Sequence, residues 1–147
     1  MNQVSPVAEF VSSPPEWGAP LRVWDVRRLR RLSESLPIVP TKVSTLPCLD
    51  RVGWYGEASH CGRLTVREVV EHARRIEASD IADPIILSAD GFVFDGFHRL
   101  AYALLHNIEE VPVRQFPQDP EPDRVNPMPS WLTNLCLSRL EKSRPEH

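Results

Sequence analysis

The 147-residue sequence lacks the features that mark membrane, secreted or disulfide-stabilised proteins. No apolar run approaches the roughly 20 residues that a membrane-spanning helix needs, and residues 1–6 have neither the basic nor the apolar region of a signal peptide. The cysteines are odd in number and show no CxxC spacing, which favours reduced thiols over a disulfide framework or a zinc site; they are Cys48, Cys61 and Cys136. We therefore expect a cytoplasmic protein with no membrane partner and no metal site of its own.

An excess of positive charge is also lacking. The 17 Lys and Arg residues against 20 Asp and Glu residues give a formal net charge of −3, so the chain has no general attraction to nucleic acids or anionic membranes. An arginine row lies within residues 27–31, but such a row on an amphipathic helix is usually a solvated face. The chain after Phe116 is too short and too rich in proline for a helix-turn-helix. The sequence therefore argues against sequence-specific DNA binding.

The 15 prolines mark the boundaries of the expected domain. Many of them lie within residues 1–20 and 117–129, and because proline fixes φ and removes a backbone donor, these flanks should be irregular. We expect an irregular arm over residues 1–20, one domain over 21–116, and a proline-rich segment with a C-terminal helix over 117–147. That helix would pack as an arm on the domain, or on a second subunit in a homodimer, through Trp131, Leu132, Leu135 and Leu140 after a Ser130 cap.

Two segments in the first half of the domain have helical patterns. Asp25 is a good N-cap for a helix that buries every third or fourth residue and stops at Pro37. Thr65 and Glu68 form a capping box at the start of a second helix. The buried stripe expected on that second helix consists of Val66, Val69, Val70, Ala73 and Ile76. Between the helices, the alternation over residues 41–46 predicts a strand.

The second half of the domain reads as strand, hairpin turn, strand, helix and strand. The strands are expected near residues 84–87, 92–94 and 111–113, with the turn over 88–91. The helix should run from about residue 97 to residue 106 and end at Asn107 in the left-handed conformation. Its buried side is expected to consist of Leu100, Ala101, Leu104 and Leu105.

The most informative motif is Asp95-Gly96-Phe97-His98-Arg99, at the junction of the second strand and this helix. The first backbone N–H groups of a helix have no intrahelical partner, so an anion is stabilised there. Arginine offers a planar fork that suits phosphate, and histidine donates to phosphate oxygens. The motif therefore predicts a phosphate site, although Asp-Gly is also an ordinary turn and Arg99 could be a solvated residue.

A polar row on the helix after Thr65 is the second candidate for the site. Glu68, His72 and Arg75 are spaced four and then three residues apart, so they can line one face of that helix. The face could look into the phosphate pocket, or it could be a solvated polar row.

The order of these segments, from the capped helix to Val111-Pro112-Val113, resembles that of the ParB/sulfiredoxin-like superfamily. The resemblance covers residues 65–116 clearly and 21–64 loosely. It implies an α/β (α+β) domain with a small mixed sheet flanked by helices, and it places a nucleotide near the helix that carries His72 and Arg75. Short bacterial ParB-like proteins share this layout.

Three branches of the superfamily compare differently with the motif. In ParB proteins, where the motif helps to hold CTP, the glycine is followed by Glu-Arg-Arg; Gly96 and Arg99 match, but Phe97 and His98 do not. In sulfiredoxins the pattern is Gly-Cys-His-Arg, and Phe97 replaces the nucleophile, so we expect no sulfinic acid reductase activity. Free-serine kinases that use ADP carry Asp-Gly-His-His-Arg, which is the nearest motif because Asp95 also matches.

These comparisons leave three functions open. The first is binding of a nucleotide (ATP, ADP or CTP, with any Mg²⁺ carried by its phosphates) or another phosphate ligand by Gly96, Phe97, His98, Arg99, His72 and Arg75. The second is phosphoryl transfer from ADP or ATP to a small molecule, with Asp95 or Glu68 as the catalytic carboxylate. The third is a nucleotide-independent interaction module that docks a partner through the arginine helix or the Trp131 arm.

Overall fold

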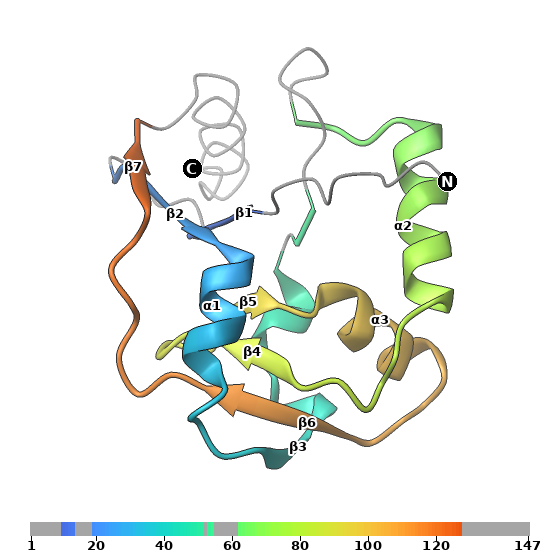
Figure 1. Ribbon diagram of the computed structural model, residues 1–147. Coiled ribbons are helices and arrows are strands. Elements are labelled where there is room, and N and C mark those ends of the chain that lie inside the picture. Colours follow the sequence, from blue (N-terminus) through green and yellow to red (C-terminus); the bar gives the residue numbers. More distant parts are fainter. Residues whose placement is uncertain (1–9, 14–18, 52, 55–61, 128–147) are drawn as a thin grey trace, which may run out of the picture.

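The computed structural model describes residues 10–13, 19–51, 53–54 and 62–127. In this part of the chain three α-helices accompany a four-stranded mixed sheet and a three-stranded antiparallel sheet (Figure 1), which confirms the expected α+β class. The helices are α1 (Val26–Ser33), α2 (Val66–Glu77) and α3 (Phe97–Leu105), and two 3-10 turns, η1 (Val43–Thr45) and η2 (Pro47–Asp50), lie between α1 and α2. The strands are β1 (Phe10–Ser12), β2 (Leu21–Asp25), β3 (Val39–Lys42), β4 (Ile85–Leu87), β5 (Val93–Asp95), β6 (Glu110–Gln115) and β7 (Arg124–Asn126).

The mixed sheet has the strand order β3-β6-β4-β5. β4 and β5 form an antiparallel hairpin, whereas β4 and β6 are parallel, with Ile85 opposite Val113 and Leu87 opposite Gln115. A parallel pair needs a crossover connection, and β5 followed by α3 supplies it. This topology places the turn between β5 and α3, which carries Gly96, at the edge of the sheet.

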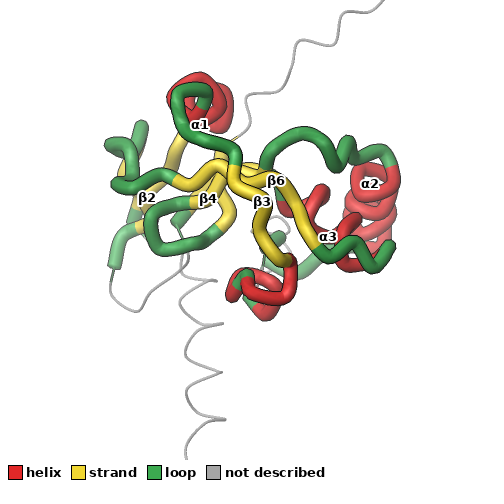
Figure 2. The backbone as a smooth tube through the Cα atoms, turned by 90° about the horizontal axis from the view of Figure 1, so that it is seen from below, coloured by secondary structure: helices red, strands yellow, loops and turns green. Residues whose placement is uncertain are grey.

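The two faces of this sheet are covered by different elements (Figure 2). Ile85, Leu87 and Val93 point to the face on which Leu100 and Ala103 of α3 pack. Neighbouring strand residues point the other way, because side chains alternate along a strand. On that second face the core consists of Trp24, Leu29, Ile86, Phe92, Phe94 and Phe116.

The three-stranded sheet draws strands from both flanks, which differs from the expected irregular chain. β1 and β7 both pair antiparallel with β2, in the order β1-β2-β7. The proline-rich segment before β7 is held by the indole Nε1 of Trp24, which donates to the Pro120 carbonyl at 2.8 Å, and by Asp123, whose Oδ2 accepts from the Asp25 amide at 2.7 Å. Proline removes backbone donors but leaves carbonyl acceptors, and side chains of the domain use them. The expected C-terminal helix and its Trp131 arm lie outside the described residues.

The expected helix ends are largely confirmed. The Asp25 carboxylate caps α1 by accepting from the Arg27 amide at 2.8 Å, and Thr65 and Glu68 form both bonds of the capping box. Asn107 has φ 55°, and the Ile108 and Asn107 amides bond to the carbonyls of residues 103 and 104 at 2.8 and 3.4 Å. This pattern is the Schellman motif that a left-handed residue permits.

The strand expected over residues 41–46 is wrong in most of its length. β3 ends at Lys42 and is followed by η1, where the Leu46 amide donates to the Val43 carbonyl at 3.1 Å. The Thr45 hydroxyl also donates to the Lys42 carbonyl at 2.7 Å. A threonine side chain that bonds to a nearby backbone carbonyl competes with strand pairing. The alternation of apolar and polar residues in the sequence gave no sign of this local bond.

The expected buried stripe of α2 is also wrong. Val66, Val69 and Val70 are 83%, 52% and 42% exposed, and no residue of α2 is buried against the described part of the chain. On α3, Leu100 and Ala103 are buried, but Leu104 and Leu105 are 57% and 61% exposed. Helical spacing gives the apolar face of a helix but not the elements that cover it.

None of the helices in the described residues is long and apolar enough to cross a membrane.

The two leucines that lie one turn apart on α3 give a matched test of this core. We expect Leu100→Ala to lower the free energy of unfolding by about 2–5 kcal/mol, because it leaves a cavity under the sheet. Leu104→Ala removes a solvent-facing side chain and should change that free energy by less than about 1 kcal/mol. Urea unfolding of both variants measures the difference, and equal losses would contradict this assignment of the α3 faces.

Candidate functional site

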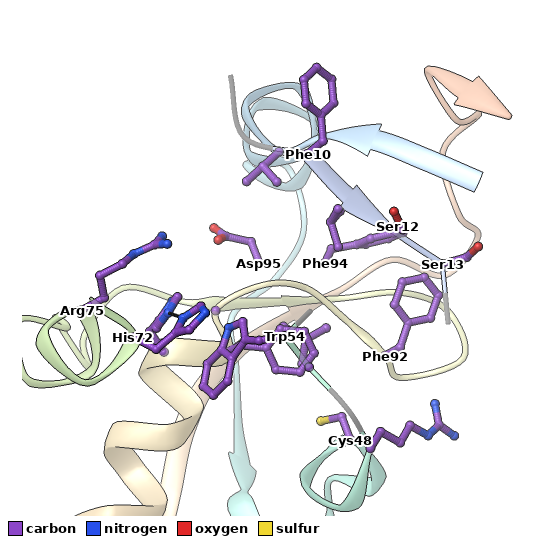
Figure 3. A pocket seen from close by; sticks show the side chains of 18 residues that line it. Phe10, Ser12, Ser13, Cys48, Trp54, His72, Arg75, Phe92, Phe94 and Asp95 are labelled. Atoms are coloured by element: carbon purple, nitrogen blue, oxygen red, sulfur yellow. Dashed lines mark hydrogen bonds between the residues drawn. The ribbon is translucent and has the colours of Figure 1, made fainter. Parts of the chain in front are cut away.

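A cavity of about 310 Å³ lies where β1, the start of α3 and the inner side of α2 meet (Figure 3). The polar side chains near α2 and α3 are His72, Arg75, Asp95 and His98, and Ser12, Ser13 and Arg51 also line the cavity. The other end is mainly apolar and includes Phe10, Val11, Phe92 and Phe94. The structure thus brings His72 and Arg75 of α2 and residues 95–98 of the motif to one cavity, although the two segments lie 20 or more residues apart in the sequence.

The start of α3 opens onto this cavity. Gly96 is the N-cap, with φ 122° and no side-chain cap, and its carbonyl accepts the first helical bond from the Leu100 amide at 2.9 Å. Gly96, Phe97 and His98 all line the cavity, so the amino end of the helix faces it. Backbone N–H groups at this end, together with the helix dipole, favour an anion.

Two histidines from different helices meet at the cavity wall. His72 Nδ1 and His98 Nε2 are 2.8 Å apart, and their rings are nearly parallel with centroids 5.1 Å apart. The Trp54 ring stacks on both imidazoles, at 4.7 Å from His72 and 4.9 Å from His98. Trp54 therefore fixes the planes of the two rings and directs their hydrogen bonding to the ring edges.

The environment of His72 disfavours a charged imidazole. Burial lowers the pKa of His72, the nearby Arg75 guanidinium lowers it further, and Glu68 opposes both effects. A pKa below the ordinary value leaves the ring neutral at pH 7. In the His72–His98 contact, one ring nitrogen then donates its N–H and the other accepts this hydrogen bond through its lone pair.

Asp95 connects the cavity to an ion-pair network beneath it. Its Oδ2 accepts from Arg30 Nε of α1 at 2.7 Å and from Arg99 Nη2 at 3.0 Å. Arg99 also pairs with Asp83 at 2.6 Å and donates to the Pro84 carbonyl at 3.0 Å. This network joins α1, β5, α3 and the chain before β4.

Arg99 is buried at 7% exposure and does not line the cavity. Its guanidinium is held by two carboxylates and a carbonyl, so a contact to phosphate would require it to leave them. The direct role expected for Arg99 stays a prediction. In the structure its contacts instead fix the position of Asp95.

Glu68 and Phe97 are also placed by the fold. The Glu68 carboxylate takes part in the capping box at Thr65, where Oε2 accepts from the Thr65 amide at 2.7 Å, and Glu68 does not line the cavity. Phe97 does line it, and its ring lies edge-on to Trp54 with centroids 6.0 Å apart. A Cβ on Gly53 would lie 2.9 Å from the Phe97 ring, so the loop that carries Trp54 comes very close to α3.

Several lining residues were not anticipated from the sequence. Trp54 and Arg51 lie in a segment without periodicity, and β1 lies in a flank that was expected to be irregular. Cys48 is buried under the cavity, and burial raises the pKa of its thiol. The sequence signal that could have indicated this loop was a single tryptophan, Trp54, next to a glycine.

Across the described residues, no group of three or more His, Cys, Asp or Glu side chains is arranged to hold a metal ion.

Gly96 and Gly91 provide a matched pair for testing the turn. Both have positive φ, but a Cβ on Gly96 would lie 3.0 Å from Ile85 Cγ1, whereas nothing lies within 4 Å of one on Gly91. We expect Gly91→Ala to lower the free energy of unfolding by about 1 kcal/mol through backbone strain. Gly96→Ala should lower it by about 2–3 kcal/mol, because the buried Ile85 must also shift. Chemical denaturation distinguishes the two, and a smaller loss for Gly96→Ala would argue against this packing.

Removing Arg99 tests the network beneath the cavity. Arg99→Ala leaves Asp95 and Asp83 without their shared partner, and we expect it to lower the free energy of unfolding by about 3 kcal/mol. Arg31→Ala, an exposed position on α1, should change it by less than about 0.5 kcal/mol. Thermal and urea unfolding of the two variants provide the measurement, and similar small losses would show that the network contributes little.

Comparison with known proteins identifies no relative of this chain. The chain matches no protein-family model, no curated protein and no solved structure.

Proposed function

We propose that the protein binds a nucleotide or another phosphate-bearing small molecule, with the phosphate at the start of α3. The observation that carries the proposal is that one cavity contains the start of α3 with its glycine N-cap, the His72–His98 pair and Arg75. Backbone N–H groups, imidazoles and a guanidinium are the groups that bind phosphate oxygens in proteins. The order α2, β4, β5, α3, β6 is also the order on which the ParB/sulfiredoxin-like resemblance rests, and it supports the same function.

Phosphoryl transfer from ADP or ATP is a second candidate, favoured by one observation. Asp95 is the one carboxylate among the described residues that line the cavity. Glu68 lies outside this lining, so of the two carboxylates considered, Asp95 is the better placed to accept a proton from an acceptor hydroxyl. Transfer that is lost in a folded Asp95→Asn variant would favour this candidate over ligand binding alone.

The interaction-module alternative has less support from the described residues. Arg28 and Arg30 of the arginine row pair with Asp123 and Asp95 of the same chain. They therefore fasten α1 to the domain, in addition to any contact with a partner. We also propose, from the sequence alone, that the protein is cytoplasmic and forms a homodimer.

Arg75 provides the direct test of the phosphate site. Calorimetric titration with ATP, ADP, CTP and phenyl phosphate should identify a ligand, and Arg75→Ala should weaken its binding at least about tenfold, because a charge-assisted bond contributes about 1.5–3 kcal/mol. Arg67→Ala on the same helix lies outside the cavity and should leave the affinity unchanged. Absence of binding by all four ligands, or equal weakening in both variants, would reject the proposed site.

A further inference from the structure

The side of the cavity that lies far from α2 carries positive charge that the proposed phosphate site does not use. Arg51 lines the cavity together with Ser13 and Phe92, and the same three residues line an adjoining cavity of about 340 Å³. Arg22 lines that second cavity. Figure 3 shows Ser13 and Phe92 on the opposite side of the first cavity from Arg75. Two guanidinium groups therefore meet where the two cavities adjoin.

These two arginines do not hold the fold together through ion pairs. Arg22 lies over the Trp24 ring at 5.3 Å, and in the described part of the chain no carboxylate pairs with Arg22 or Arg51. Arg28 and Arg99, in contrast, pair with carboxylates of the same chain. Like charges that line one hollow repel each other, so an anion that contacts both is stabilised there. A guanidinium can bind phosphate through two parallel hydrogen bonds.

The extended chain at β5 measures the distance between the two ends of the first cavity. Phe92 lies at the end that Arg51 lines, and Gly96 lies at the start of α3. A strand rises about 3.3 Å per residue, which separates these two residues by about 13 Å. Phe94 lies midway along this stretch, and Val11 of β1 adds a second apolar side chain to the lining. The two phosphates of ADP share a bridging oxygen, so they are too close together to reach both ends.

We propose that Arg51 and Arg22 form a second phosphate subsite, so that the cavity binds an elongated bisphosphate with an apolar middle. One phosphate lies at the start of α3 near Arg75, the apolar middle packs against Phe94, and the other phosphate lies between the two arginines. The first placement rests on the proposed function, whereas the second depends on residues that the proposed function does not involve. Asp90 also lines the second cavity, and its charge limits the affinity of this subsite.

A comparison of three ligands tests the inference on the unmodified protein. Octamethylene bisphosphate, octyl phosphate and trimethylene bisphosphate differ in the second phosphate or in the length of the apolar chain. We expect calorimetry at low ionic strength to show that octamethylene bisphosphate binds at least about tenfold more tightly than octyl phosphate, because two guanidinium groups contact the second phosphate. A gain of only about twofold, which two equivalent ends give for statistical reasons alone, would overturn the subsite. Equal affinities for the two bisphosphates would also overturn it, because the shorter one cannot span the cavity.

Matched variants assign the gain to the second cavity. Arg51→Gln should reduce the ratio of the affinities for octamethylene bisphosphate and octyl phosphate at least about threefold, as expected for a solvent-exposed ion pair. Arg63→Gln changes an exposed arginine outside both cavities and should leave the ratio unchanged. Asp90→Asn removes a negative charge from the second cavity and should raise the ratio. Equal ratios in the two arginine variants, or a lower ratio in Asp90→Asn, would contradict the assignment.

The outcomes separate the subsite from the proposed function. If octyl phosphate binds and octamethylene bisphosphate binds no more tightly, the phosphate site at α3 stands and the second subsite is rejected. If binding of the bisphosphate depends on Arg51 but is unchanged in Arg75→Ala, the subsite stands and the proposed function fails. If neither ligand binds, both proposals fail. If Arg51→Gln does not fold, the comparison of the three ligands on the unmodified protein still decides.

Discussion

The carboxylate of Asp95 is the point on which the arrangement of the cavity depends. One of its oxygens accepts from Arg30 of α1 and from Arg99 of α3, and Arg99 continues to Asp83 before β4. A charge that is 13% exposed would be costly without such partners. Since Asp95 is followed directly by Gly96, the same ion pairs that neutralise it also fix where α3 begins.

The cavity combines this fixed charge network with a wall of aromatic rings. His72 comes from α2 and His98 from α3, and Trp54 covers the faces of both. α2 has no buried residue in the described structure, so its side chains next to the cavity are among its main contacts with the domain. The position of α2 and the geometry of the histidine pair therefore depend on each other.

Local signals in the sequence were sufficient for the segment that surrounds the motif. The caps at Asp25, Thr65 and Asn107 could be predicted because each is made within a few residues of the chain. The spacing of His72 and Arg75 showed that they could share one helix face, but it left open whether that face is solvated or lines a cavity, and the structure places both residues in one cavity with His98. The exposure of Val69 could not be predicted, because a helical stripe does not say which element covers it. The strand at residues 124–126 was missed because its pairing partner is about 100 residues away. The strand at residues 10–12 pairs with the nearby residues 23–25, but it lies in a flank whose prolines predicted irregular chain.

The pairing of β2 with both β1 and β7 has a consequence for the order in which the protein folds. β1 forms one wall of the cavity, yet a two-stranded ribbon of β1 and β2 is marginal in water without a third strand. That third strand, β7, pairs Leu21 with Asn126, across about 100 residues of chain. During synthesis the mixed sheet and α3 can be complete while β7 is still inside the ribosome. A nascent chain therefore has the ion-pair network before β7 stabilises the β1 wall of the cavity, and the cavity is completed last.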